Sequence, residues 1–164
     1  MTRLETAIRA VVAALLAKSA EVDAKIPAPL RNEDIVSRMV EAGSGLSLYL
    51  NVLDGDRDNP DELLGADLGN VNGYELVQNV HIEWAVAGGS SEDRETRFDD
   101  GRKAIWDALK ADVEAGGVTY LGGAVDGLKL MDILPHQATN AAGLPNVKSA
   151  EFVFQLTFTS PDPF

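Results

Sequence analysis

The feature that most constrains the fold is the run AEFVFQLTFTS at residues 150–160. Its large apolar side chains occupy every second position, which places Phe152, Phe154, Leu156 and Phe158 on one face of an extended chain. Polar or smaller side chains occupy most of the positions between them. The run predicts a strand that buries one face against another layer of the molecule.

Three other segments also predict strands. LSLYLNVL at 46–53 alternates leucine or valine with Ser47, Tyr49 and Asn51, as a half-buried strand does. YELVQNVHIEWAVAG at 74–88 is longer and overhangs its predicted neighbours. LKLMDIL at 128–134 is the third strand in chain order, before the strand at 150–160.

Two segments predict helices with one apolar face. Thr2 and Glu5 form a capping box, and apolar residues then follow helical spacing, so we expect a helix from about 2 to 20. Gly88 to Ser91 interrupt the chain and cap a second helix that runs to about Ala115. Gly101 is expected to weaken this second helix in its middle.

These elements predict a single α+β domain over residues 1–164 in the order α-β-β-α-β-β. The expected architecture is an antiparallel sheet with both helices packed on one face. Residues 23–45 are interpreted as an arm and residues 54–73 as an acidic loop insertion. The residues expected to share one core are Leu4, Ile8, Leu15, Phe98, Ile105, Leu109, Phe152, Phe154 and Phe158.

Charge and composition exclude several kinds of function. The net charge of −12 opposes binding to phosphate backbones and to anionic membranes. The absence of cysteine excludes disulfides, zinc–thiolate sites and cysteine nucleophiles. No stretch approaches the length of about 18–20 apolar residues that a membrane span needs.

The stretch LDGDRDNPDE at 53–62 resembles a calcium loop because Asp54, Asp56 and Asp58 occupy alternate positions. An EF-hand loop starting at Asp54 would need glycine at its sixth position and glutamate at its twelfth. Those positions hold Asn59 and Gly65. The sequence therefore favours hydrated loop residues over a metal site.

Other site patterns are also incomplete. GGAVDGLK at 122–129 lacks the spacing of a phosphate-binding loop, and GSGLSL at 43–48 lacks the third glycine of a dinucleotide fingerprint, so both predict turns. His81 and Glu83 share a strand face and would make a possible metal pair, but an ordinary strand histidine is the favoured interpretation. No serine lies in a nucleophile elbow. We expect no cofactor, no metal and no enzymatic activity.

The C-terminal half carries a family resemblance. A strand with alternating apolar residues, a loop, a long helix and a T-x-L-G-G-x-V-D element before a closing strand resemble the tail terminator proteins of long-tailed phages, the lambda-like family with its gene transfer agent relatives. That element stands here as Thr119, Leu121, Gly122, Gly123, Val125 and Asp126. The N-terminal helix RLETAIRAVVAALL also fits the family.

This resemblance implies an α+β structural protein of the virion, made in the host cytoplasm and placed at the junction of tail and neck. Its partners would be five further copies in a hexameric ring, the tail tube protein and a head-completion or stopper protein. DNA would pass through the ring without specific binding. The alternative that the residues leave open is a small-ligand binding domain or a non-catalytic subunit of a cytoplasmic enzyme.

The acidic stretch supplies the candidate functional residues. Leu63 and Leu64 are adjacent leucines in a polar run and are expected to meet a neighbouring subunit. Asp56, Asp58 and Asp61 are expected at the subunit interface or on the channel, where like charge would keep DNA from sticking. The competing hypothesis is a flexible, solvated loop.

Overall fold

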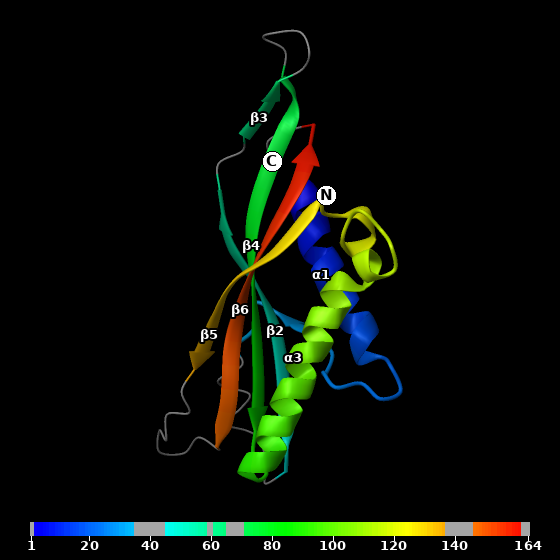
Figure 1. Cartoon of the computed structure of the whole chain (residues 1–164). Coiled ribbons are helices and arrows are strands. Elements are labelled where there is room, and N and C mark those ends of the chain that lie inside the picture. Colours follow the sequence, from blue (N-terminus) through cyan, green and yellow to red (C-terminus); the bar gives the residue numbers. More distant parts are fainter. Residues whose placement is uncertain (1, 35–44, 59–60, 65–70, 137–145, 162–164) are drawn as a thin grey trace.

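The computed structural model describes residues 2–34, 45–58, 61–64, 71–136 and 146–161 (Figure 1). Its described elements are two α-helices, a short 3-10 helix and a six-stranded sheet. In chain order they are α1 (Arg3–Ser19), β1 (Leu30–Arg31), β2 (Ser47–Arg57), β3 (Asp61–Leu64), β4 (Val71–Ala87), α3 (Ser91–Glu114), η1 (Leu121–Gly123), β5 (Gly127–His136) and β6 (Val147–Ser160). The predicted single α+β domain is confirmed.

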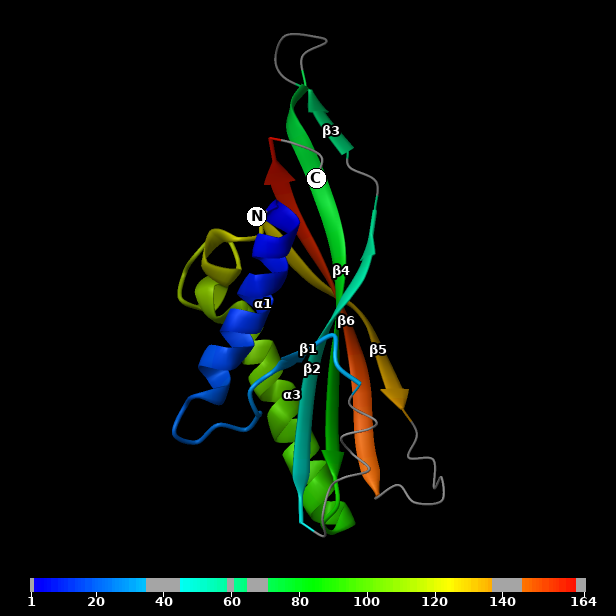
Figure 2. The same ribbon diagram turned by 180° about the vertical axis from the view of Figure 1, so that it is seen from behind.

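Both α-helices of the described residues lie on one face of the twisted sheet, as predicted (Figures 1 and 2). Helix α3 packs against β4 and β6, and α1 packs against α3 and η1. The shared core contains every predicted core residue except Leu4, which is half-buried and packs against it. Burial of this apolar layer is the main favourable term in folding.

Strands β4 and β6 form the centre of the sheet. They pair antiparallel from Tyr74 opposite Ser160 to Ala87 opposite Val147. Along β6 the side chains alternate between buried and half-buried, so Phe152, Phe154 and Leu156 all face the helices. The alternation at 150–160 therefore identified both the strand and its buried face.

The sheet is mixed, so the prediction of a wholly antiparallel sheet is wrong. Strand β1 pairs parallel with β2, with Leu30 opposite Asn51, and it lies within the segment interpreted as an arm (Figure 2). Two residues are too few to show an alternation, which hid this strand in the sequence. Asn32 ends it in the left-handed region, at φ 52°.

The interpretation of 54–73 as a loop is also wrong over much of its length. Strand β2 continues to Arg57, β3 pairs with β4, and β4 begins at Val71. The order α-β-β-α-β-β therefore misses β1 and β3. Asp54, Asp56 and Arg57 are exposed, so this part of β2 leaves the core and shows no apolar alternation.

Gly101 lets helix α3 pack closely against Trp84 of the sheet. Ser90 caps the helix by accepting a hydrogen bond from the Asp93 backbone N–H at 3.1 Å. Gly101 faces the sheet, and a Cβ added there would lie 2.1 Å from Trp84 Cζ2. Glycine thus lets α3 approach a fully buried tryptophan, whose Nε1 donates to the Phe98 carbonyl at 3.0 Å. The prediction of a weakened helix overlooked this contact.

Candidate functional site

The five predicted site residues belong to one projecting element, which we call the acidic ribbon: residues 54–58, β3 and residues 71–75 of β4. Asp56 lies on β2 and Asp58 directly after it, both with exposed side chains. The backbone of β3, which holds Asp61, Leu63 and Leu64, pairs with the start of β4. The side chains of β3 lie outside the described residues, so their contacts stay a prediction.

The acidic ribbon extends past the rest of the sheet. Strand β6 ends at Ser160, opposite Tyr74, and of the described strands only β3 and β4 continue beyond this point (Figure 1). The helices lie alongside the sheet below it (Figure 1). An isolated two-stranded ribbon is marginally stable in water, so its base needs support.

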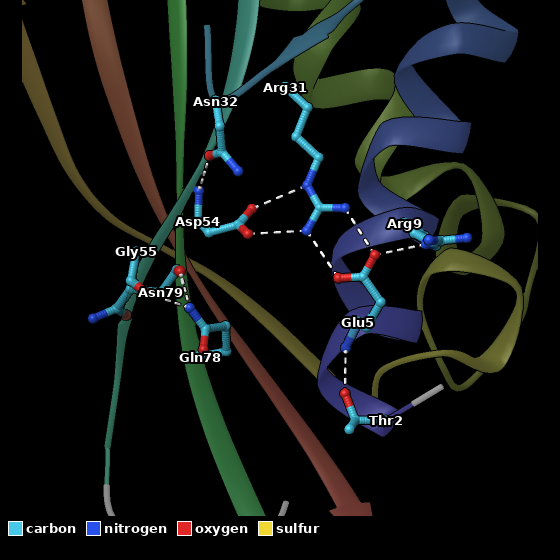
Figure 3. Close-up of polar contacts among 9 residues, drawn as sticks. All are labelled: Thr2, Glu5, Arg9, Arg31, Asn32, Asp54, Gly55, Gln78 and Asn79. Atoms are coloured by element: carbon cyan, nitrogen blue, oxygen red, sulfur yellow. Dashed lines mark hydrogen bonds and ion pairs between the residues drawn. The ribbon is translucent and has the colours of Figure 1, made fainter.

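Arg31 supplies that support from the helix side (Figure 3). Its Nη1 and Nη2 donate to the two carboxylate oxygens of Glu5 on α1, both at 2.9 Å. Its Nε and Nη2 also donate to Asp54 on β2, at 3.2 and 2.9 Å. Arg9 adds a donor to Glu5 at 2.6 Å. One guanidinium therefore ties α1 to the strand from which the acidic ribbon departs.

The electrostatics of this cluster follow from the same contacts. Hydrogen bonds from Arg31, and then from Arg9, lower the pKa of Glu5 from 4.5 to about 2. Hydrogen bonds to Glu5 and Asp54 raise the pKa of Arg31 further above its usual range. The side chains of Glu5, Arg31 and Asp54 are each about one third exposed, so solvent weakens each ion pair taken alone. They stabilise the fold mainly as a linked network.

A β-bulge forms the other half of the base (Figure 3). The pairing of β2 with β4 shifts register between Asp54 and Arg57. Gln78, which is 2% exposed, donates through Nε2 to the carbonyls of Gly55 at 2.6 Å and Asn79 at 2.7 Å. A Cβ at Gly55 would lie 2.7 Å from the Asn79 carbonyl oxygen. Glycine is required here because the two backbones approach closely.

The calcium-like spacing falls on an extended strand and its end. Asp54 is bound by Arg31, and its backbone N–H donates to Asn32 Oδ1 at 3.0 Å. Within the described part of the chain, no three His, Asp or Glu residues gather closely enough to hold a metal ion. The acids at 54–58 are therefore placed as strand and surface residues.

His81 and Glu83 have separate partners on the sheet face away from the helices. His81 Nδ1 contacts the carboxylate of Glu151 across the strand pair. Glu83 accepts a hydrogen bond at 2.8 Å from Asn51 Nδ2, and the same buried amide nitrogen donates to the Glu33 carbonyl at 2.7 Å. These contacts tie adjacent strands and the segment after β1 together, and they do not converge on a common point.

The T-x-L-G-G-x-V-D element forms the turn between α3 and β5. Gly122 and Gly123 have φ values of 67° and 82°, which glycine adopts without strain, and Leu121 before them also lies in the left-handed region, at φ 55°. Val125 is buried, and Asp126 Oδ2 accepts bonds from the Thr159 N–H and hydroxyl at 2.9 and 3.0 Å. The prediction that the glycine-rich run at 122–129 is a turn is confirmed for residues 122–126, and β5 follows directly.

Sequence reasoning missed a groove beside β5. It has a volume of about 530 Å³ and lies between α3 and the edge of the sheet. Its apolar lining includes Trp106, Leu130, Ile133, Phe152 and Phe154, and Trp106 stacks on Phe154 with ring centroids 6.0 Å apart. The position of Trp106 beside the apolar face of α3 was the one signal available in the sequence.

None of the described helices is both long and apolar enough to cross a membrane. Comparison of the chain with models of protein families and with curated proteins gave no match.

Proposed function

We propose that this chain is a structural virion subunit that forms a hexameric ring on the end of a tail tube. In that role it terminates the tube, joins it to the head-completion or stopper protein, and lets DNA pass through its channel. The observation that carries the proposal is the acidic ribbon, which projects from the sheet and is anchored at its base by Arg31 and Gln78.

The composition of the ribbon suits a contact between subunits and a DNA channel. Residues 54–75 contain seven acids and one base, Arg57. A channel lined with such charge repels the DNA backbone and prevents sticking. Leu63 and Leu64 lie within this charged segment, and adjacent leucines at the end of a projection are costly to leave in water. A neighbouring subunit would cover them.

The remaining support comes from the resemblance and from the architecture that accompanies it. The T-x-L-G-G-x-V-D element makes a tight turn that feeds the edge strand β5, and its Asp126 fastens the turn to β6. Each residue of the element whose contacts are described has a structural task. This pattern suits a protein that works through its shape and its surfaces.

The test uses two sets of substitutions in the acidic ribbon. Leu63→Ser with Leu64→Ser should leave the monomer folded and weaken ring assembly or tube capping. Leu16→Ser is the matched control, because Leu16 is 50% exposed on α1, and it should assemble normally. Changing Asp56, Asp58 and Asp61 to Lys should leave assembly intact and slow DNA passage. Normal assembly and function in both ribbon variants would refute this role.

The groove beside β5 favours a second candidate, a small-ligand binding domain. Its volume of about 530 Å³ and its aromatic lining fall within the range of ligand pockets. Saturable binding of a small molecule with a matching rise in melting temperature would support this candidate. Assembly of rings on tail tubes would support the first.

A further inference from the structure

Strand β5 forms one edge of the sheet among the described strands. In the described part of the chain it pairs with β6 alone, and it is the last strand in the sheet order β1-β2-β4-β6-β5 (Figure 1). Met131, Ile133 and Leu134 on this strand are 46%, 44% and 41% exposed. An open edge that carries a cluster of exposed apolar side chains is a template for pairing with another chain.

The two faces of β5 are set by its register with β6. Leu128 and Ile133 lie opposite Leu156 and Phe152, which belong to the buried face of the sheet. Lys129 and Asp132 lie opposite Gln155 and Val153, which belong to the face away from the helices. Met131 is the extra residue of a β-bulge between Leu130 and Asp132.

The bulge makes the strand symmetrical. In a regular strand without a bulge, positions 129 and 132 would point to opposite faces, because they are three residues apart and side chains alternate along a strand. With the bulge, Lys129 and Asp132 face the same side of the sheet, and Leu128 and Ile133 face the other side. The pattern of faces is therefore the same when read in either direction from the point between Leu130 and Met131. Apolar Leu128 and Ile133 are then equivalent, and so are basic Lys129 and acidic Asp132.

From this symmetry we propose that two copies of the chain pair antiparallel through β5, about a twofold axis between Leu130 and Met131. In this register Lys129 of each copy lies opposite Asp132 of the other, so two ion pairs form on the same face. Leu128 lies opposite Ile133 on the helix side, and Leu130 lies opposite Met131 at the centre. An isologous contact of this kind is self-complementary.

The groove beside β5 supports a second copy as the occupant. Leu130 and Ile133 line the groove and also lie on the pairing edge, so a partner strand on β5 covers its open side. The rim residues Asp99, Asp100, Arg102 and Lys103 carry no net charge together, and Arg102 and Lys103 already pair with Asp99 and Asp107. The rim therefore presents no net charge to the approaching copy.

This inference goes beyond the proposed ring. A twofold contact closes on itself, whereas a ring of six needs a head-to-tail contact between two different surfaces. The β5 dimer is thus a form of the free subunit, and its assembly can be measured without tail tubes. Failure of the dimer leaves the ring proposal standing, and failure of tube capping leaves the dimer standing.

A charge exchange tests the register. Lys129→Asp places aspartate opposite Asp132 at both sites, and Asp132→Lys places lysine opposite Lys129, so each variant alone should dimerise at least about tenfold more weakly. A mixture of the two variants restores an opposite-charge pair at both sites. It should therefore form a heterodimer with about the affinity of the original chain, measured by sedimentation equilibrium.

Two exposed residues of the segment after α1 supply matched controls. Lys25→Asp and Asp23→Lys make the same changes in net charge away from β5 and should leave dimerisation unchanged. Circular dichroism checks the fold of every variant. The proposal is overturned by an original chain that sediments as a monomer up to its solubility limit, by charge variants that associate normally, or by a mixture that stays monomeric.

Discussion

Replacing Gly101 by alanine separates two physical effects of opposite sign. Alanine in a helix interior is favoured over glycine by about 1 kcal/mol, so helix propensity alone predicts a more stable protein. In the structure, the new methyl group would lie 2.1 Å from Trp84 Cζ2 and 2.5 Å from Cε2. These distances are far below van der Waals contact, so the ring or the helix must move.

Neither movement is easy. Trp84 is fully buried, and its Nε1 donates to the Phe98 carbonyl at 3.0 Å. Overpacking of this kind costs about 1–3 kcal/mol, and loss of a buried hydrogen bond costs about 1–3 kcal/mol more. After the helix gain of about 1 kcal/mol is subtracted, we expect Gly101→Ala to lower the free energy of unfolding by about 1–5 kcal/mol.

Urea unfolding followed by circular dichroism measures this change, and tryptophan fluorescence reports any displacement of Trp84. Thr96→Ala in the same helix is the control. Thr96 is exposed, so alanine there should stabilise the protein by a few tenths of a kcal/mol through helix propensity alone. If Gly101→Ala also stabilised the protein, by about 1 kcal/mol, the close packing of α3 on Trp84 would be refuted.

The fold lowers the pKa of Glu5 from 4.5 to about 2. The stability that the ionised Glu5 contributes is therefore present above about pH 4.5 and is lost as the pH falls toward 2. Because Arg31 is the main cause of this shift, Arg31→Met should reduce the acid dependence of stability. Equal slopes of unfolding free energy against pH in this range, for variant and original, would contradict the role of Arg31. Phe154→Ala should lower the free energy of unfolding in urea by about 3–5 kcal/mol, because the ring is 3% exposed and stacks on Trp106. A loss below about 1 kcal/mol would mean that the ring contributes little to the core. Calcium or a chelator should leave the melting temperature unchanged, since Asp54 is engaged by Arg31, and a clear rise with calcium would instead establish a metal site in the acidic ribbon.

The long elements were predictable because each repeats a physical pattern many times. The alternation around Phe154 marked β6, and the apolar spacing after Thr2 marked α1. The strand at 74–88 was predicted to overhang its neighbours, and β4 does so where it continues beyond Ser160 of β6. Because the pattern repeats many times along such a segment, one tertiary contact does not change the secondary structure that it predicts.

The short and polar strands were not predictable by the same means. Strand β1 is two residues long, and the end of β2 carries exposed Asp54 and Asp56, so neither shows an apolar period. Their pairing depends on the backbone of partners that are distant in sequence. The close contact of Gly101 with Trp84 was not predictable for a related reason, since helix propensity carries no information about which residues pack against the helix.

The base of the acidic ribbon depends on residues far apart in the sequence. Arg31 lies 26 positions from Glu5 and 23 from Asp54, and only the parallel pairing of β1 with β2 brings the three together. No local spacing could reveal that cluster. The acidic segment itself was visible, as an unusual concentration of charge with two leucines inside it.

The central claim is the hexameric ring on a tail tube, and electron microscopy of tube ends tests it most directly. Purified protein mixed with tail tubes should produce a six-fold ring at one end of each tube, with the acidic ribbons at subunit contacts or on the channel. Tube ends that stay bare at saturating protein, or a ring of another symmetry, would contradict this account.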